Sequence, residues 1–326
     1  MSELLVIRFS ALGDVAMTVP VLAGVACANR DLRITFLTQQ RFSIFSRYLP
    51  DNVEIVTADL HGVHSGLQGL ERLLREIDYQ RFDMVADLHD VWRTKYMRMR
   101  LCMSGSKVRH IAKGRFEKLA LTRRCCKRFR QLPTAIERYE QVFKLLGLRT
   151  DTDLYRSSNI SDVKRAGIGI APFAAHRGKV YPLEKMEGIV KQLSDEGKRV
   201  YLFGGGRDEV EMLMSWEIKY ANCECVAGRM SMAEEIALMG RLEVMVTMDS
   251  GNMHLASLVG TRVVSIWGAT HPYAGFLGYG QKEDDCVQLP LGCRPCSIYG
   301  KKVCRYGDYH CLTDISQAAI INRIKR

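Results

Sequence analysis

Short apolar runs alternate with amphipathic segments along the chain, and this alternation predicts strands followed by helices. The first run, residues 4–9, ends in polar turn residues, and from Val15 onward apolar positions recur at helical spacing. Similar runs predict strands at 34–38, 53–57 and 84–87, and an amphipathic helix is expected at 67–77. Strands and helices in this order indicate a parallel sheet with helices on both faces.

The same alternation begins again after residues 149–164, a polar stretch without periodicity that we interpret as a linker. The expected strands are 168–171, 199–203, 244–247 and 262–267, and the expected helices are 183–196, 208–220, 232–241, 252–258 and 315–324. Residues 113–150 are expected to be mostly helical with a break at Pro133, and the tail, residues 286–312, to be irregular. The sequence therefore predicts α/β domains at 1–155 and 165–312, followed by a C-terminal helix at 313–326.

Length and composition agree with a folded protein of two domains. The chain has 326 residues, of which 47% are hydrophobic and 25% charged. No stretch approaches the ~20 apolar residues that a membrane-spanning helix needs. The N-terminus lacks the basic first region of a signal peptide, so we expect a cytoplasmic protein.

The net charge of +11 is concentrated in one basic block, residues 91–130. This block contains fourteen Lys or Arg residues and one acid, Glu117. Such a block indicates an anionic partner, which could be nucleic acid, anionic lipid head groups or a phosphorylated substrate. A solvated, positively charged face is the alternative interpretation.

Three polar junctions follow predicted strands, where open parallel sheets bind their ligands. In the first, Gly13 permits a tight turn and Asp14 begins a helix, either as a helix cap or as a general base. In the second, Lys179 lies in a loop and could meet a diphosphate, with Arg177 as a competing cation. The third is the strand-to-helix junction Asp249, Ser250, Gly251, Asn252, Met253 and His254, whose helix start favours phosphate.

The cysteine pattern leaves several alternatives open. Eleven cysteines, an odd number, argue against a full disulfide framework. Cys293, Cys296, Cys304 and Cys311 have the spacing C-x2-C-x7-C-x6-C. A zinc site, reduced packing cysteines and disulfides all remain possible for these four residues.

Taken together, these junctions resemble glycosyltransferase family nine, the heptosyltransferases of lipopolysaccharide core assembly. The resemblance is carried by LLVIRFSALGDVAMTVPVL, IAPFAAHRGKVYPLEKM, FGGGRDE, VAGRMSMAEEIALM and TMDSGNMHLASLVGTRVVSIWGATHP, in the family's order. The tail CRPCSIYGKKVCRYGDYHCLTDIS is similar to that of many members. Where the family usually has Asp-Thr-Gly-Pro, this chain has Ser250 and Asn252.

The resemblance implies a GT-B fold, with two Rossmann-like domains whose parallel sheets face across a cleft. It implies an inverting transfer without a metal or cofactor, with Asp14 as general base and Lys179 stabilising the leaving diphosphate. The implied donor, ADP-heptose or another nucleotide sugar, would contact Ser10, Gly13, Arg207, Met230, Asp249, Ser250, Gly251, Asn252, Met253 and His254. The implied acceptor is an anionic glycolipid at the inner face of the cytoplasmic membrane, bound through Arg93, Lys95, Arg98 and Lys113.

Two rival functions are compatible with parts of the sequence. A nucleotide-sugar 2-epimerase would share the fold but needs no separate acceptor, and the junction at residues 10–14 with the basic block favours transfer. A nucleic-acid-binding protein would explain the net charge. The basic block, however, lacks regularly interleaved aromatic residues and any known nucleic-acid-binding signature, so we expect no nucleic-acid partner.

Overall fold

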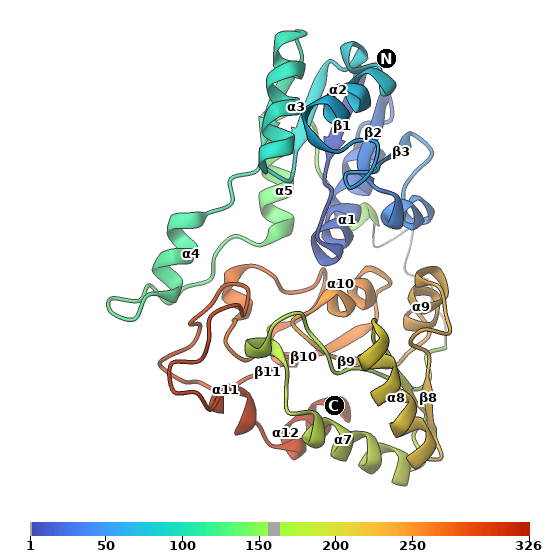
Figure 1. The fold of residues 1–326 in the computed structure, drawn as a ribbon, viewed down its shortest axis with the longest axis vertical. Coiled ribbons are helices and arrows are strands. Elements are labelled where there is room, and N and C mark those ends of the chain that lie inside the picture. Colours follow the sequence, from blue (N-terminus) through green and yellow to red (C-terminus); the bar gives the residue numbers. More distant parts are fainter. Residues whose placement is uncertain (1, 156–163) are drawn as a thin grey trace. The chain divides into compact units, whose positions relative to one another are not determined.

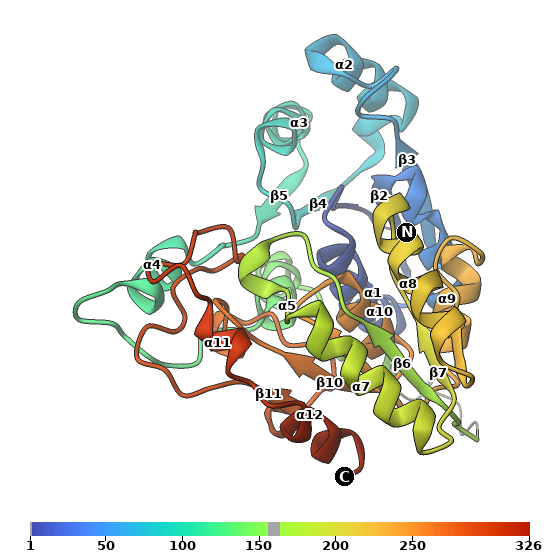
Figure 2. The ribbon, with the colours of Figure 1, turned by 60° about the horizontal axis from the view of Figure 1, so that its bottom comes forward.

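The computed structural model describes residues 2–155 and 164–326. Within these stretches the chain forms two compact units, residues 2–113 with 135–155, and residues 114–134 with 164–326. Much of the predicted linker, residues 156–163, lies outside the described residues. Figures 1 and 2 show both units.

The first unit is built on a five-stranded parallel sheet with the order β3-β2-β1-β4-β5. Its strands are β1 (Ser2–Ile7), β2 (Leu32–Gln39), β3 (Val53–Ala58), β4 (Met84–Asp87) and β5 (Lys107–His110). In the central strand β1, residues 4–7 are fully buried. A continuous apolar run of this kind is what a strand covered on both faces requires.

Helices cover both faces of this sheet. They are α1 (Leu12–Ala28), α2 (Gly66–Glu76), α3 (Trp92–Met103) and α5 (Ala135–Leu146), with 3₁₀ turns η1 (Gln40–Tyr48) and η2 (Tyr79–Arg81). Helix α1 packs beside α5, and α2 packs beside α3 (Figures 1 and 2). Because right-handed crossovers leave β1 and β4 in opposite directions, the two pairs lie on opposite faces.

The second unit contains a six-stranded parallel sheet with the order β11-β10-β9-β6-β7-β8. Its strands are β6 (Ile168–Ala171), β7 (Val200–Leu202), β8 (Cys223–Cys225), β9 (Val244–Met248), β10 (Arg262–Ile266) and β11 (Cys286–Val287). Residues from β6, β9 and β10 form its buried centre together with Met186, Leu193 and Trp216 from the covering helices.

The helices of this unit are α4 (Arg115–Thr122), α7 (Leu183–Asp195), α8 (Arg207–Lys219), α9 (Met232–Met239), α10 (Gly251–Leu258), α11 (His310–Thr313) and α12 (Gln317–Ile324). Short 3₁₀ turns are η3 (Arg177–Lys179), η4 (Pro272–Ala274) and η5 (Glu283–Asp285). Helix α12 packs beside α7, and α10 packs beside α9 (Figure 1). The crossover directions place these two pairs on opposite faces of the sheet.

Residues 114–134 belong by their contacts to the second unit, although the sequence suggested a first domain of residues 1–155. Leu121 and Leu132 pack in an apolar cluster with Ala274. The Lys127 ammonium donates hydrogen bonds to the carbonyl oxygens of Gly292, Arg294 and Pro295, at 3.0, 2.8 and 3.3 Å. The basic block is thereby divided, with seven of its Lys and Arg residues in each unit.

Most predicted elements are present within one or two residues of their expected ends, and β4 and β6 match them fully. The sequence did not predict α3, β5 or β8, and the tail expected to be irregular contains β11 and the start of α11. Helix α3 buries only Thr94, Met97 and Leu101 among many charged residues, so its periodicity is weak. Strand β5 is a mostly exposed edge of four residues, and β8 has three. Residues 113–150, expected to be mostly helical, hold the two separate helices α4 and α5.

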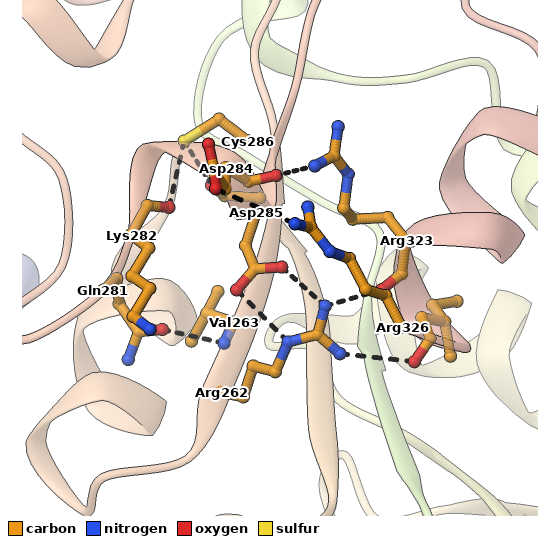
Figure 3. Close-up of polar contacts among 11 residues, drawn as sticks. Arg262, Val263, Gln281, Lys282, Asp284, Asp285, Cys286, Arg323 and Arg326 are labelled. Carbon is orange, nitrogen blue, oxygen red and sulfur yellow. Dashed lines mark hydrogen bonds and ion pairs between the residues drawn. The ribbon is translucent and has the colours of Figure 1, made fainter.

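A polar network fastens the C-terminal helix to the second sheet (Figure 3). Arg262 of β10 binds both carboxylate oxygens of Asp285, at 2.5 and 3.2 Å. The same guanidinium donates to the carbonyl oxygens of Arg323 and Ile324, at 2.7 and 3.3 Å, in the last turn of α12. Arg323 in turn donates to the carbonyl oxygen of Asp284. One side chain thus satisfies two helix-end carbonyls that would otherwise have no partner within the helix.

We predict that Arg262→Met lowers the stability of the second unit by about 2 kcal/mol, because it leaves the mostly buried Asp285 carboxylate without its cation. This corresponds to a Tm lower by about 5 °C, measured by thermal unfolding. The control is Arg199→Met, which removes the exposed ion pair with Glu224 and is expected to change the Tm little. Equal effects of the two substitutions would contradict the anchoring role of Arg262.

Candidate active site

In each sheet the strand order reverses at one point. The charged and titratable side chains of the candidate site follow the strands at that point. In the first unit the chain leaves the neighbouring strands β1 and β4 in opposite directions, and in the second unit it does so from β6 and β9. The carboxyl ends of two such strands flank a crevice in which open α/β sheets bind ligands. Asp14 and His89 follow the first pair of strands, and Lys179 and Asp249 follow the second.

Asp14 lies in the first turn of α1, and Arg8 holds its carboxylate in place. Their side chains form an ion pair at 2.5 Å, in which Arg8 is buried and Asp14 remains 30% exposed. Arg8 also donates to the carbonyl oxygen of Leu88 and lies over the Tyr139 ring, 5.7 Å from its centroid. A carboxylate oriented in this way and still open to solvent can accept a proton from a bound hydroxyl group.

His89, directly after β4, faces the same turn. Its Nδ1 accepts a hydrogen bond from the backbone N–H of Phe9, at 3.4 Å, so its Nε2 carries the proton and donates to Ser10 Oγ, also at 3.4 Å. Burial, reinforced by the nearby Arg8 and Lys113 charges, lowers the pKa of His89 to about 3. His89 is therefore a neutral group that holds Ser10, and it does not donate protons to a reaction at neutral pH.

An acidic loop after β4 binds two of the cations that the sequence assigned to the acceptor. Arg98 of α3 pairs with Asp87 at 3.2 Å and with Asp90 at 3.4 Å. Lys113 donates to the backbone carbonyl oxygen of Asp90, at 3.0 Å. These contacts fix both cations beside the end of β4. Arg93 of the same helix α3 lies over the ring of its neighbour Trp92, and Lys95 is exposed.

In the second unit, Lys179 and Asp249 form an ion pair of 3.1 Å. Both side chains are mostly buried, with 16% and 7% exposed. Arg177, the competing cation, turns away toward the Tyr309 ring and donates to the carbonyl oxygen of Val180. Of the two cations in the loop, Lys179 is thus the one at the carboxyl ends of β6 and β9.

The tail holds the Lys179 loop in position. A β-carbon on Gly300, whose φ is +74°, would lie 2.5 Å from Lys179 Cγ. A β-carbon on Gly178 would lie 2.9 Å from the Gly300 carbonyl oxygen, and Ala269 donates a backbone hydrogen bond to Gly178. Glycine is strongly favoured at residue 300, because the left-handed backbone disfavours other residues and a β-carbon would collide with the lysine stem.

Helix α10 begins directly after Asp249 and Ser250. The Ser250 hydroxyl group meets that of Thr247 at 3.1 Å and makes no side-chain cap of the helix, so it does not occupy the first-turn N–H groups. Met253 and His254 are buried in the first turns of the helix, and Asn252 is half-buried. The arrangement offers backbone N–H groups and a positive helix end to an anion.

The other predicted donor residues make no hydrogen bond or ion pair with Lys179 or Asp249 among the described residues. Arg207 begins α8, is 89% exposed and pairs with Glu211 at 2.9 Å. Met230 is half-buried just before α9. In the first unit, Ser10 lies in the turn that leads into α1, where it contacts His89, and Gly13 lies in the first turn of α1. These four residues are positioned at loops or helix starts, as strand-end ligand residues must be.

All eleven cysteines are free thiols in this structure, so the disulfide alternative for the tail is not realised. Among the described residues, no three His, Cys, Asp or Glu side chains are arranged to hold a metal ion. No helix in the described part of the chain has the length and apolar character to span a membrane.

Sequence reasoning missed Arg8, His89 and Gly300. Arg8 occupies an inward position of the first apolar run, where a cation signals a buried partner. The residues Asp87-Leu88-His89-Asp90 follow a predicted strand and were a visible polar cluster. Their proximity to Asp14 required knowing that β4 pairs with β1. The contact between Gly300 and Lys179 joins residues over one hundred positions apart, and no local pattern signals it.

The chain is similar to glycosyltransferases of known family. Residues 70–310 match glycosyltransferase family 9 (heptosyltransferase), and the chain belongs to this family. It is 31% identical over 115 residues to lipopolysaccharide heptosyltransferase 2 of Escherichia coli K12, an alignment that covers 33% of each chain. It is 25% identical over 138 residues to lipooligosaccharide heptosyltransferase 2 of Campylobacter jejuni, covering 40% of this chain and 42% of the relative. The matched regions thus span well under half of these curated relatives.

Solved structures match over almost the entire chain. Escherichia coli heptosyltransferase WaaC with ADP superimposes with a TM-score of 0.71 at 18% identity, covering 99% of both chains. A family 9 glycosyltransferase from Veillonella parvula gives a TM-score of 0.73 at 19% identity, covering 99% of this chain and 96% of the other. These neighbours confirm the predicted α/β fold class and its GT-B assignment.

We predict that His89→Gln flattens the dependence of Tm on pH between 6.5 and 4. Native His89 stays neutral down to about pH 3, whereas the unfolded imidazole takes up a proton near pH 6.5. The unfolded state therefore binds more protons as the pH falls, and the native state loses stability. The measurement is thermal unfolding across this pH range, with His61→Gln at an exposed site as control. Parallel curves for wild type and His89→Gln would contradict the neutral buried ring.

Proposed function

We propose that this protein is an inverting glycosyltransferase that moves a heptose from ADP-heptose to the lipopolysaccharide core or a related glycolipid. The observation that carries the proposal is the Lys179–Asp249 pair at the strand-order reversal, beside the start of α10. The family assignment supports the reaction class, and the named heptosyltransferase relatives support the sugar. The structural neighbour WaaC, solved with ADP, supports the nucleotide.

In the proposed reaction, the second unit binds the donor. The Lys179 ammonium has three N–H donors, of which Asp249 accepts one at 3.1 Å. The others would meet diphosphate oxygens, together with the backbone N–H groups of residues 250–253 at the helix start. Asp249 would also orient sugar hydroxyl groups, and His254, Asn252 and Met253 line the first turns of the same helix. As the bond to the anomeric carbon breaks, Lys179 would stabilise the charge that develops on the leaving ADP.

Asp14 of the first unit would act on the acceptor. An acceptor hydroxyl oxygen attacks the anomeric carbon from the face opposite the diphosphate, and the Asp14 carboxylate takes up its proton. The Arg8 ion pair would hold the carboxylate in the orientation that receives this proton. The direct displacement inverts the anomeric configuration. No metal ion is needed in this scheme, since Lys179 and the helix start supply the positive charge at the leaving group.

The acceptor would be anionic, and cations of the first unit would bind it. We propose that Arg93 and Lys95 contact acceptor phosphate groups or the inner membrane surface directly. Arg98 and Lys113, already bonded to Asp87 and Asp90, would contact the acceptor from fixed positions. The activity itself is tested by incubating the purified protein with ADP-heptose and heptose-deficient lipopolysaccharide and detecting the enlarged product, with and without EDTA. Release of epimerised free nucleotide sugar without an acceptor would favour the epimerase instead.

We predict that Asp14→Asn lowers kcat by about 10²–10³-fold, because an amide cannot take up the hydroxyl proton. ADP affinity, measured by calorimetry, is expected to stay unchanged, since the donor half is intact. Asp83→Asn is the control, because Asp83 is an exposed carboxylate at the opposite edge of the same sheet. Full turnover by Asp14→Asn would rule out its role as general base.

We predict that Lys179→Met lowers kcat by about 10²-fold and weakens ADP binding, because the leaving diphosphate loses its cation. Arg177→Met, in the same loop but turned toward Tyr309, is expected to retain activity within a few-fold. Lys179→Met also leaves the buried Asp249 carboxylate unpaired, so the double variant Lys179→Met/Asp249→Asn serves to separate stability from catalysis. If this double variant recovers both stability and turnover, Lys179 acts only in folding.

A further inference from the structure

A basic cavity lies in the second unit, apart from the proposed donor residues. Its volume is about 310 Å³, and its walls come from the end of α4 with residues 123–127, from Ala269 and from the tail. The cationic side chains that line it are Arg123, Arg124, Lys127, Arg294, Lys302 and Arg305. No described Asp or Glu lines the cavity, and neither do Lys179, Ser250 or His254. The concentration of one sign of charge in a concave site favours an anionic ligand.

The six cations form two groups: two are bonded to backbone carbonyl oxygens, and four are exposed at the rim of the cavity. Lys127 and Arg294 are engaged with backbone carbonyl oxygens, and Arg294 is only 4% exposed. Arg123, Arg124, Lys302 and Arg305 are exposed, and no carboxylate within the described stretches pairs with them. The Arg305 guanidinium lies over the Tyr306 ring. Fixed charges at the base and uncommitted donors at the rim are an arrangement that binds phosphate oxygens through charge-assisted hydrogen bonds.

Two of the four thiols in the wall, Cys296 and Cys311, do not offset this charge. Burial raises the pKa of Cys311 to about 11 and also raises that of Cys296, so both are neutral at physiological pH. Burial lowers the pKa of Arg294 to about 10, which still leaves it charged. The cavity therefore carries a net positive charge near pH 7.

A second cavity of about 470 Å³ adjoins the first and shares Lys127, Gly292 and Arg294 with it. Its other walls include the apolar side chains of Phe129, Leu289 and Leu291, and also the acid Glu283. A cationic chamber beside an apolar one suits an amphipathic ligand with a phosphate group.

We propose that the basic cavity binds a phosphate monoester on the glycolipid acceptor, and this identification of the ligand rests on the proposed function. The phosphate would lie among Arg123, Arg124 and Lys302, above Lys127 and Arg294, and apolar parts of the same ligand would enter the adjoining cavity. Residues 114–134 thus carry an acceptor-binding function on the second unit, in addition to the cations of the first unit.

The test compares wild type with the cavity variant Arg123→Gln/Arg124→Gln/Lys302→Gln. The control variant, Lys191→Gln/Lys198→Gln/Arg199→Gln, removes three exposed cations elsewhere in the second unit. Two probes distinguish the source of the phosphate. The first is glucose 6-phosphate, measured by calorimetry, and the second is phosphatidylcholine vesicles with or without phosphatidic acid, measured by co-sedimentation. ADP binding and thermal unfolding are measured for every variant.

We expect wild type to bind at least one phosphate probe and the cavity variant to bind it at least about tenfold more weakly. The control variant is expected to match wild type. Loss of glucose 6-phosphate binding assigns the site to the phosphorylated saccharide, and loss of vesicle binding alone assigns it to the lipid. Binding of neither probe, or equal binding by the cavity and control variants, overturns the proposal. An intact ADP affinity in every variant separates that failure from a failure of the proposed transferase function.

Discussion

Parallel pairing of the described strands is the constraint on which the rest of the structure depends. Because all strands of a sheet point the same way, their carboxyl ends form one edge, and every strand-to-helix turn opens there. The reversal of strand order then selects one place on each edge where two turns diverge. Asp14 and His89 occupy this place in the first sheet, and Lys179 and Asp249 occupy it in the second. Chemistry-bearing residues are thus brought together by topology, without proximity in the sequence.

Each of these places holds an ion pair whose net contribution to folding stability is small. Arg8, Lys179 and Asp249 are largely buried, and desolvation of such groups offsets much of the attraction to their partners. An apolar pair of similar volume would pack at least as well. The retained charges are therefore better explained by chemistry, since each pair keeps one member at the crevice with a fixed orientation. Gly300, which leaves room for the Lys179 stem, is part of the same arrangement.

The sequence predicted what depends on local pattern. Asp14, Lys179 and Asp249 were identifiable because each follows an apolar run at a polar turn, and such turns fall at strand ends in an alternating α/β chain. Which residues contact one another in the fold was not predictable from local pattern. That Arg8 pairs with Asp14, that His89 faces Ser10 and that Gly300 contacts Lys179 follow from strand order and from packing of the tail. Strand β5 and helix α3 escaped prediction because their exposed, charged residues outnumber the few that pack.

The division of the basic block between the two units also depends on tertiary contacts that local pattern does not predict. This division changes how the block is interpreted. Residues 91–130 form one charged stretch in the sequence, yet their contacts assign half of the cations to each unit. Apolar anchors decide this, because Leu121 and Leu132 pack with Ala274 and Lys127 caps three carbonyl oxygens of the tail. The cations of residues 114–134 are consequently held by the unit that also carries the Lys179–Asp249 pair. The block is continuous in the sequence but forms two separate groups of cations. Each group is held by its own unit, on which an anionic ligand can be oriented.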